Sequence, residues 1–451
     1  TYVENLMFMP TNLVDIRDPM ETVAGKFQHS GKFNLVVLDG DKYIGFVSRA
    51  NVFSKYREML KDFSEHFLRN VIALKIIPDS EGMAYDLFES LNNRGFPLSQ
   101  ADLIKNFLLK ECDTDNERDQ VSDLWVSINE KIDNAPLSIK VTDLLHYSHI
   151  SRWGYRKATD IYSAVVETVN ESTSPVQYAK ELKKDAIALT SVGKEAFNST
   201  IKERVDALID SLTIMNVKLA YVALVPAYQI FNKKAEWEVL ARMVINFCFR
   251  YMKIMSKDPA SLARIMSEVA IRIRDLNPED AKDGISDISS VFTSAAGNEI
   301  FKEEFSNASF PRQRKLAAYT LRQIENKLME DTAIQLKQHG HKLDLEHIAP
   351  SKPTEDEWKV FFDMKSNDDN DFQRYLWRLG NMVMLEESIN RSLKNKAIDL
   401  KLNSPDTIDY NHSQAISPKK VYEFLDGDEW TKKSIELRQQ WLARLAPDVW
   451  R

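Results

Sequence analysis

Hydrophobic residues in the middle of the chain recur every three or four positions, the spacing that gives a helix one apolar face. Two clear examples are Val205-Leu208-Ile209-Leu212 and Met243-Val244-Phe247-Tyr251. Glycine is sparse between residues 111 and 335, so few positions there favour a break in a helix. We therefore expect an almost entirely helical domain over residues 111–335, within an α+β protein that is mainly α.

A smaller α/β pattern precedes this domain. Residues 18–28 predict a helix, residues 32–38 and 43–47 predict strands joined by an Asp39-Gly40-Asp41 turn, and a helix to about Phe63 begins at Ser48. This order resembles the second half of a CBS domain, of the kind carried on bacterial chloride channels. The resemblance makes Ser48 a candidate nucleotide contact. CBS modules normally work in pairs and one incomplete copy is present, so a packing module is the alternative.

The C-terminal part predicts a strand, a second strand and a helix. Residues 343–350, Leu-Asp-Leu-Glu-His-Ile-Ala-Pro, alternate apolar and polar side chains and then stop at a proline. After an acidic insertion, residues 379–385 predict the returning strand, and a polar helix is expected to begin near Glu387 or Asn390. A carboxylate and a histidine at a strand end, with amides close by, outline a one-metal phosphodiesterase site.

Each candidate residue has a chemical reason. Hydrolysis of a phosphodiester needs a base for the attacking water and a cation for the developing charge. His347 is the candidate base, since an imidazole titrates near working pH. Glu346 and Asn390 offer oxygen ligands, which suit Mg²⁺ or Mn²⁺, and Asn381 is expected to orient the imidazole. The simpler alternative is that Glu346 and His347 form an ordinary polar pair at a strand end.

Three motifs in order carry a family resemblance. Glu-His-Ile-x-Pro, Leu-Gly-Asn and Asn-x4-Asn-Lys are together similar to the HNH (ββα-metal, His-Me finger) nuclease domain of GmrSD-type modification-dependent restriction endonucleases. The resemblance assigns the catalytic histidine to His347, the middle asparagine to Asn381 and the third position to Asn390. Glu346 stands where many HNH nucleases have a metal-binding aspartate, so its ligand role is less direct.

A second string supports the same family. Phe-Glu-x-Leu-Asn-x-Arg-Gly at residues 88–95, followed by Leu-Ser-x-x-Asp-Leu-Ile-Lys-Asn, resembles the end of the nucleotide-dependent domain of GmrSD proteins. That domain's Asp-Gly-Gln-Gln-Arg type motif does not occur in this sequence, so a nucleotide requirement is left open. We expect four parts: a CBS-like half module at 1–66, a remnant of the NTPase-like domain at 67–110, the helical domain at 111–335 and the nuclease domain at 336–451.

Two local clusters of basic residues, rather than the net charge of the chain, indicate where DNA could bind. The formal net charge is −7, which argues against a generally basic nucleic-acid protein but not against a local basic surface. The expected DNA-contacting residues beside the site are Arg391, Lys394, Asn395 and Lys396, with Lys401 close by. A second basic cluster lies upstream, at Arg312, Arg314, Lys315, Arg322 and Lys327. The alternative for each cluster is a solvated helix face.

Other candidate chemistry is weaker. The two cysteines, Cys112 and Cys248, imply neither a disulfide framework nor a thiolate zinc site. His146 and His149 are expected to be core or surface histidines rather than metal ligands. The most apolar window, residues 213–230, is interrupted by polar residues and a proline, so no membrane span is expected. The absence of a methionine at Thr1 suggests a fragment, and we expect a cytoplasmic location.

The sequence thus predicts a metal-dependent endonuclease that hydrolyses foreign DNA, with base modification left open. Two alternatives stay open at this point. One is a non-catalytic DNA-binding or regulatory scaffold, and the other is an RNase that uses the same site. The oligomeric state does not follow from the sequence.

Overall fold

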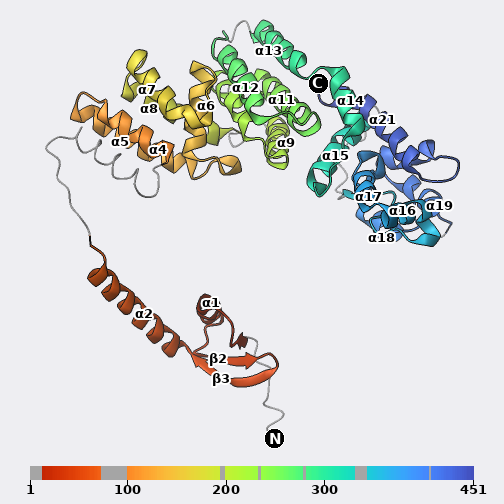
Figure 1. The fold of residues 1–451 in the computed structure, drawn as a ribbon, viewed down its shortest axis with the longest axis horizontal. Coiled ribbons are helices and arrows are strands. Elements are labelled where there is room, and N and C mark those ends of the chain that lie inside the picture. Colours follow the sequence, from red (N-terminus) through yellow and green to blue (C-terminus); the bar gives the residue numbers. More distant parts are fainter. Residues whose placement is uncertain are drawn as a thin grey trace. The chain divides into compact units, whose positions relative to one another are not determined.

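The computed structural model describes residues 13–72, 99–192, 199–231, 235–277, 281–330, 343–405 and 408–451. The motif at 88–95, and with it most of the expected remnant of the NTPase-like domain at 67–110, lies outside these residues. The chain divides into two compact units, residues 1–79 and 80–451 (Figure 1). The mainly helical α+β class is confirmed. Within the described residues, the helices are too short or too polar to cross a membrane.

The first unit is a three-stranded sheet with two helices. Its elements are β1 (Leu13–Asp15), α1 (Met20–Ser30), β2 (Asn34–Asp39), β3 (Lys42–Ser48) and α2 (Arg49–Asn70). Strand β1 runs parallel to β2, and β3 pairs antiparallel with β2 across a turn at Gly40, which has a φ of 61°. The expected helix and hairpin are confirmed. The sequence analysis missed β1 and ended α2 too early, at Phe63.

Ser48 has a structural task in this unit. Its hydroxyl accepts a hydrogen bond from the Asn51 N–H at 3.1 Å, which caps the N-terminus of α2. The nucleotide contact suggested by the CBS resemblance stays a prediction.

The second unit begins with the expected run of helices. They are α4 (Gln100–Lys110), α5 (Asp115–Ile132), α6 (Val141–Trp153), α7 (Ile161–Glu171), α8 (Pro175–Ser191), α9 (Ser199–Met215), α10 (Tyr221–Phe231), α11 (Ala235–Cys248), α12 (Pro259–Arg274), α13 (Ala281–Ala295), α14 (Asn298–Asn307) and α15 (Arg314–Glu330). The Ser99 hydroxyl caps α4 by accepting a hydrogen bond from the Asp102 N–H. The buried Trp125, Phe247 and Phe249 belong to one large hydrophobic core, which we call the helical core. Both cysteines are buried and free.

A two-stranded hairpin follows. Strand β4 (Leu343–His347) pairs antiparallel with β5 (Met382–Glu386), and α18 (Glu387–Leu393) continues directly from β5. The acidic insertion forms α16 (Glu355–Asn367) and α17 (Asp369–Leu376), two helices that the sequence analysis did not assign. The remaining helices are α19 (Ile398–Leu402), α20 (Ile416–Lys419) and α21 (Lys432–Val449).

The hairpin is buried on both faces. Leu343, Leu345, Met382 and Met384 join the helical core. Val383 and Leu385, which alternate with them, join a smaller core with aromatic side chains from the insertion. Because successive side chains of a strand point to opposite faces, one short hairpin can serve two cores. It therefore sits fixed between the helical domain and the C-terminal elements.

The last helix joins the same two cores. Ile435, near the start of α21, lies in the smaller core, whereas Leu442 and Trp450 lie in the helical core. The Trp450 indole stacks on Phe249, with ring centroids 4.2 Å apart. Arg250 donates hydrogen bonds to the carbonyls of Pro447 and Trp450. The end of the chain is thus fastened to the helical domain.

Candidate active site

His347 is the last residue of β4 and pairs with Met382. Its imidazole packs edge-on against Trp377, with ring centroids 4.9 Å apart, and its buried Nε2 has no hydrogen-bond partner among the described residues. Burial lowers the His347 pKa to about 4, and the positive charges of Arg314 and Lys401 act in the same direction. The imidazole is therefore neutral near pH 7, with one ring nitrogen available as a proton acceptor.

Glu346 pairs with a buried lysine. Its Oε1 lies 3.3 Å from Nζ of Lys401, a residue of α19 whose side chain is fully buried. Burial raises the pKa of Glu346 and lowers the pKa of Lys401, while each charge opposes the shift of its partner. The expectation that Lys401 belongs to a basic surface is wrong, because its ammonium points into the protein.

Asn381 is fully buried and lies directly before β5. Its Oδ1 accepts hydrogen bonds from the Ala349 N–H at 2.9 Å and from the Trp430 indole at 3.0 Å. Its Nδ2 donates to the carbonyls of Ala349, at 3.1 Å, and Leu376, at 3.3 Å. These four bonds use the full capacity of an amide. Asn381 therefore holds the backbone two residues after His347 rather than bonding to the imidazole.

The residues before β5 are held in turn by α21. Residues 379–381 form a 3₁₀ turn, so the second strand begins at Met382 and not at Leu379 as expected. The buried Arg438 donates to the carbonyls of Leu379, Gly380 and Met382. Gln439 accepts a bond from the Gly380 N–H at 2.6 Å. A side chain at position 380 would meet the Ile435 carbonyl oxygen at 2.1 Å, so only glycine fits this close approach.

Asn390 lies on α18, which packs against both strands of the hairpin. It is half-buried, as Glu346 is. The structure thus brings Glu346, His347, Asn381 and Asn390 into one strand-strand-helix unit. Their catalytic and metal-binding roles stay predictions.

The expected DNA-contacting residues follow α18. Arg391, Lys394 and Asn395 are exposed, and Lys396 is half-buried. Arg391 forms an ion pair with Glu387, one helical turn away. The backbone carbonyl of Asn395 accepts a bond from the Trp358 indole at 2.9 Å, which ties this segment to the insertion.

The upstream basic cluster approaches the same hairpin. Arg312, Arg314, Lys315 and Arg322 are exposed, whereas Lys327 is half-buried and pairs with Glu330. Arg314, the first residue of α15, donates to the Leu345 carbonyl of β4 at 2.6 Å. Cations from α15 and from the segment after β5 therefore lie close to the hairpin.

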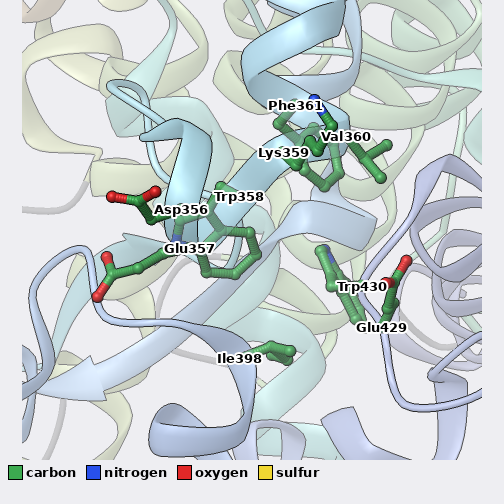
Figure 2. Close-up of a pocket in the computed structure, with 9 residues that line it drawn as sticks. All are labelled: Asp356, Glu357, Trp358, Lys359, Val360, Phe361, Ile398, Glu429 and Trp430. Carbon is green, nitrogen blue, oxygen red and sulfur yellow. The ribbon is translucent and has the colours of Figure 1, made fainter.

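A hollow on the insertion side has the opposite charge. Its lining holds three carboxylates and one lysine among apolar side chains: Asp356, Glu357, Trp358, Lys359, Val360, Phe361, Ile398, Glu429 and Trp430. Figure 2 shows the two indoles in the middle of this hollow and the carboxylates towards its outside. Phosphate groups are repelled by such a rim.

One comparison decides the family of this region. Residues 295–445 match the family model described as GmrSD restriction endonucleases, C-terminal domain. This segment is therefore similar to the C-terminal domain of GmrSD restriction endonucleases. The resemblance inferred from the three motifs is confirmed for it. No curated protein matches the chain.

The segment similar to the GmrSD C-terminal domain covers about a third of the chain and begins before the hairpin. It takes in α14 and α15, which supply Arg314, and most of α21, which supplies Arg438 and Gln439. The residues that hold the hairpin from outside thus belong to the matched segment.

The donor set of this segment suits a hard divalent cation. Glu346 and Asn390 offer a carboxylate and an amide oxygen on two elements that pack together. The described residues hold no cluster of three or more His, Cys, Asp or Glu side chains that could enclose a metal. Two protein oxygens, with water and phosphate completing the shell, are the arrangement that Mg²⁺ commonly adopts.

Sequence reasoning missed Trp377 and Gln439 as parts of this site, and it placed Lys401 there as a surface charge rather than as the buried partner of Glu346. Each acts through a contact with a residue far away in the chain: Trp377 on His347, Lys401 on Glu346 and Gln439 on Gly380. The sequence offered one signal. Lys401 follows the Asn-x4-Asn-Lys motif closely, yet a lysine there reads as a surface charge.

Proposed function

We propose that this protein is a divalent-metal-dependent endonuclease that hydrolyses phosphodiester bonds of foreign DNA at the β4-β5-α18 unit. The observation that carries the proposal is the strand-strand-helix unit that joins Glu346, His347, Asn381 and Asn390 inside the segment similar to the GmrSD C-terminal domain. A scaffold without catalysis would not need a buried, neutral imidazole at a strand end next to oxygen donors.

His347 acts as the general base. The neutral imidazole accepts a proton from the attacking water as the water oxygen bonds to phosphorus. The bond from phosphorus to the leaving sugar oxygen breaks, and that oxygen takes a proton from solvent water. Asn381 fixes the turn that carries the imidazole by bonding to Ala349. Arg391, Lys394, Asn395 and Lys396 bind the sugar-phosphate backbone, which positions the strand without reading its bases.

Glu346 and Asn390 would hold the cation, Mg²⁺ or Mn²⁺. When bound, the cation offsets the negative charge that develops on the phosphate. Burial raises the pKa of Glu346, and the ammonium of Lys401 opposes that rise.

Plasmid cleavage by wild-type protein and by His347→Ala in Mg²⁺ or Mn²⁺ tests the proposal. A general base contributes about 100-fold to 10,000-fold, so we expect the variant to lose at least about 100-fold in rate. Its circular dichroism spectrum should stay that of the wild type. His412→Ala is the matched control, because this exposed histidine caps a turn outside the site. It should cleave normally.

Three results would overturn the proposal. An unchanged rate for His347→Ala removes the base assignment. Retention of DNA without cleavage, with no metal bound, favours a binding scaffold. Cleavage of matched RNA but not DNA, with a chelator control, assigns the same site to an RNase.

A further inference from the structure

Lys401 is a charged side chain buried in the protein interior, where removing its ammonium from water costs free energy. Its side chain has no exposed surface, and its Nζ lies 5.7 Å from the centre of the Trp358 ring. An ammonium removed from water must recover its lost hydration through hydrogen bonds and paired charge. The partners of Lys401 therefore show what this lysine is there to hold.

The three partners form one compact set. Nζ of Lys401 donates to Glu346 Oε1 at 3.3 Å, to the His347 carbonyl at 3.1 Å and to the Ile348 carbonyl at 3.0 Å. An ammonium has three N–H donors, so its capacity is filled by three consecutive residues of the candidate site. Two of these bonds are to backbone and do not depend on the ionisation of a side chain.

The backbone of residues 348 and 349 also forms hydrogen bonds with Asn381, in the segment before β5. The Ile348 N–H donates to the Asn381 carbonyl at 2.8 Å, and the Asn381 amide bonds both polar groups of Ala349. The backbone from His347 to Ala349 is thus bonded by two residues, Lys401 and Asn381, which are 32 or more positions away in the chain. A displacement of the His347–Ala349 backbone would therefore disturb the bonds to Lys401 or those to Asn381.

We propose that Lys401 is a positioning residue for the reaction: it fixes the His347-Ile348 backbone and the Glu346 carboxylate together, so that base and metal ligand keep one spacing. This inference rests on the proposed function. Lys401 touches neither substrate nor metal in this role, and it acts through the residues that do. A misplacement of about 1 Å in such a group costs about 100-fold in rate.

The first test does not depend on cleavage. Lys401→Met keeps an unbranched side chain one heavy atom shorter than lysine and removes the three N–H donors. Hydrogen-deuterium exchange of the peptide 343–350 should become at least about tenfold faster in this variant, because charge-assisted bonds to the turn are lost. A peptide from α21 should keep its wild-type exchange rate and serves as the internal reference.

The second test separates positioning from folding. Lys401→Met leaves Glu346 buried without its cation, which could unfold the domain. Lys401→Met/Glu346→Gln removes that unpaired charge, and the faster exchange at 343–350 should persist in it relative to Glu346→Gln alone. For cleavage, Lys401→Met should lower kcat about 100-fold with the KM for DNA unchanged. Lys419→Met, an exposed lysine on α20, should match the wild type in both assays.

The outcomes divide clearly. Wild-type exchange at 343–350 in a folded Lys401 variant overturns the proposal, and so does faster exchange with an unchanged kcat. A lower kcat with unchanged exchange at 343–350 would mean that Lys401 has a different role, and this result would also overturn the proposal. Normal cleavage by His347→Ala would instead defeat the proposed function, while the exchange result would still report whether Lys401 holds the turn.

Discussion

Replacing Gly380 by alanine adds one methyl group at the closest contact between the hairpin and α21. The new Cβ would lie 2.1 Å from the Ile435 carbonyl oxygen, 3.0 Å from the carbon of that carbonyl and 3.1 Å from the Gln439 nitrogen. All three are backbone atoms, so no side-chain rotation can relieve the overlap. Carbon atoms prefer separations near 3.5 Å, and the helix and the turn must therefore part by about 1 Å.

The expected cost has two parts. Overpacking of a well-packed site costs about 1–3 kcal/mol. The displacement also weakens the bond from the Gly380 N–H to Gln439 and the bond from Arg438 to the Gly380 carbonyl. Each such bond contributes about 1 kcal/mol. We therefore expect Gly380→Ala to lower the free energy of unfolding by about 2–4 kcal/mol.

Urea unfolding followed by tryptophan fluorescence measures this change. All eight tryptophans lie between Trp125 and Trp450, so the signal reports the second unit. Gly25→Ala in α1 is the matched control, because a Cβ there has nothing within 4 Å, and it should leave the fluorescence transition unchanged. A loss of less than about 0.5 kcal/mol for Gly380→Ala would refute the reasoning, since surface changes alone reach that size.

Two further predictions concern metal and pH. Asn390→Ala should raise the Mg²⁺ concentration needed for half-maximal cleavage, and an unaltered titration would mean that another residue is the ligand. Burial, helped by Arg156 and His146, lowers the His149 pKa to about 4 from 6.5. The neutral form is favoured by folding, so this stability is present above pH 6.5 and is lost as pH falls towards 4. The contribution of His149 to the free energy of unfolding should be about 2 kcal/mol smaller at pH 5 than at pH 7. His149→Gln should flatten that dependence, and an equal slope in both proteins would contradict it.

Local pattern was enough to predict the elements that carry the candidate site. The alternation before Pro350 indicates a strand that ends at His347, and α18 begins at Glu387, one of the two starting residues expected. Both follow from spacing within a few residues, which the sequence displays directly. The helical domain follows in the same way from its three-and-four spacing.

The contacts that fix the site could not be predicted in this way. Lys401 and Arg391 are both basic residues near one motif, yet one is fully buried and the other exposed. The difference depends on Glu346, 55 positions away from Lys401. The Leu-Gly-Asn segment was expected to continue a strand. It bends into a 3₁₀ turn because Arg438 and Gln439 of α21 bind its backbone.

Helix α21 packs in both cores, so the C-terminal part cannot be separated from the helical domain without exposing buried side chains. Cutting the chain near residue 336 would free the hairpin and α21 from their partners and expose Trp450 and the apolar half of that helix to water. The segment that carries the candidate site is therefore not an independent domain that can be moved alone to another protein. A graft onto another protein would also have to include Phe249 and the neighbouring aromatic residues on which Trp450 packs.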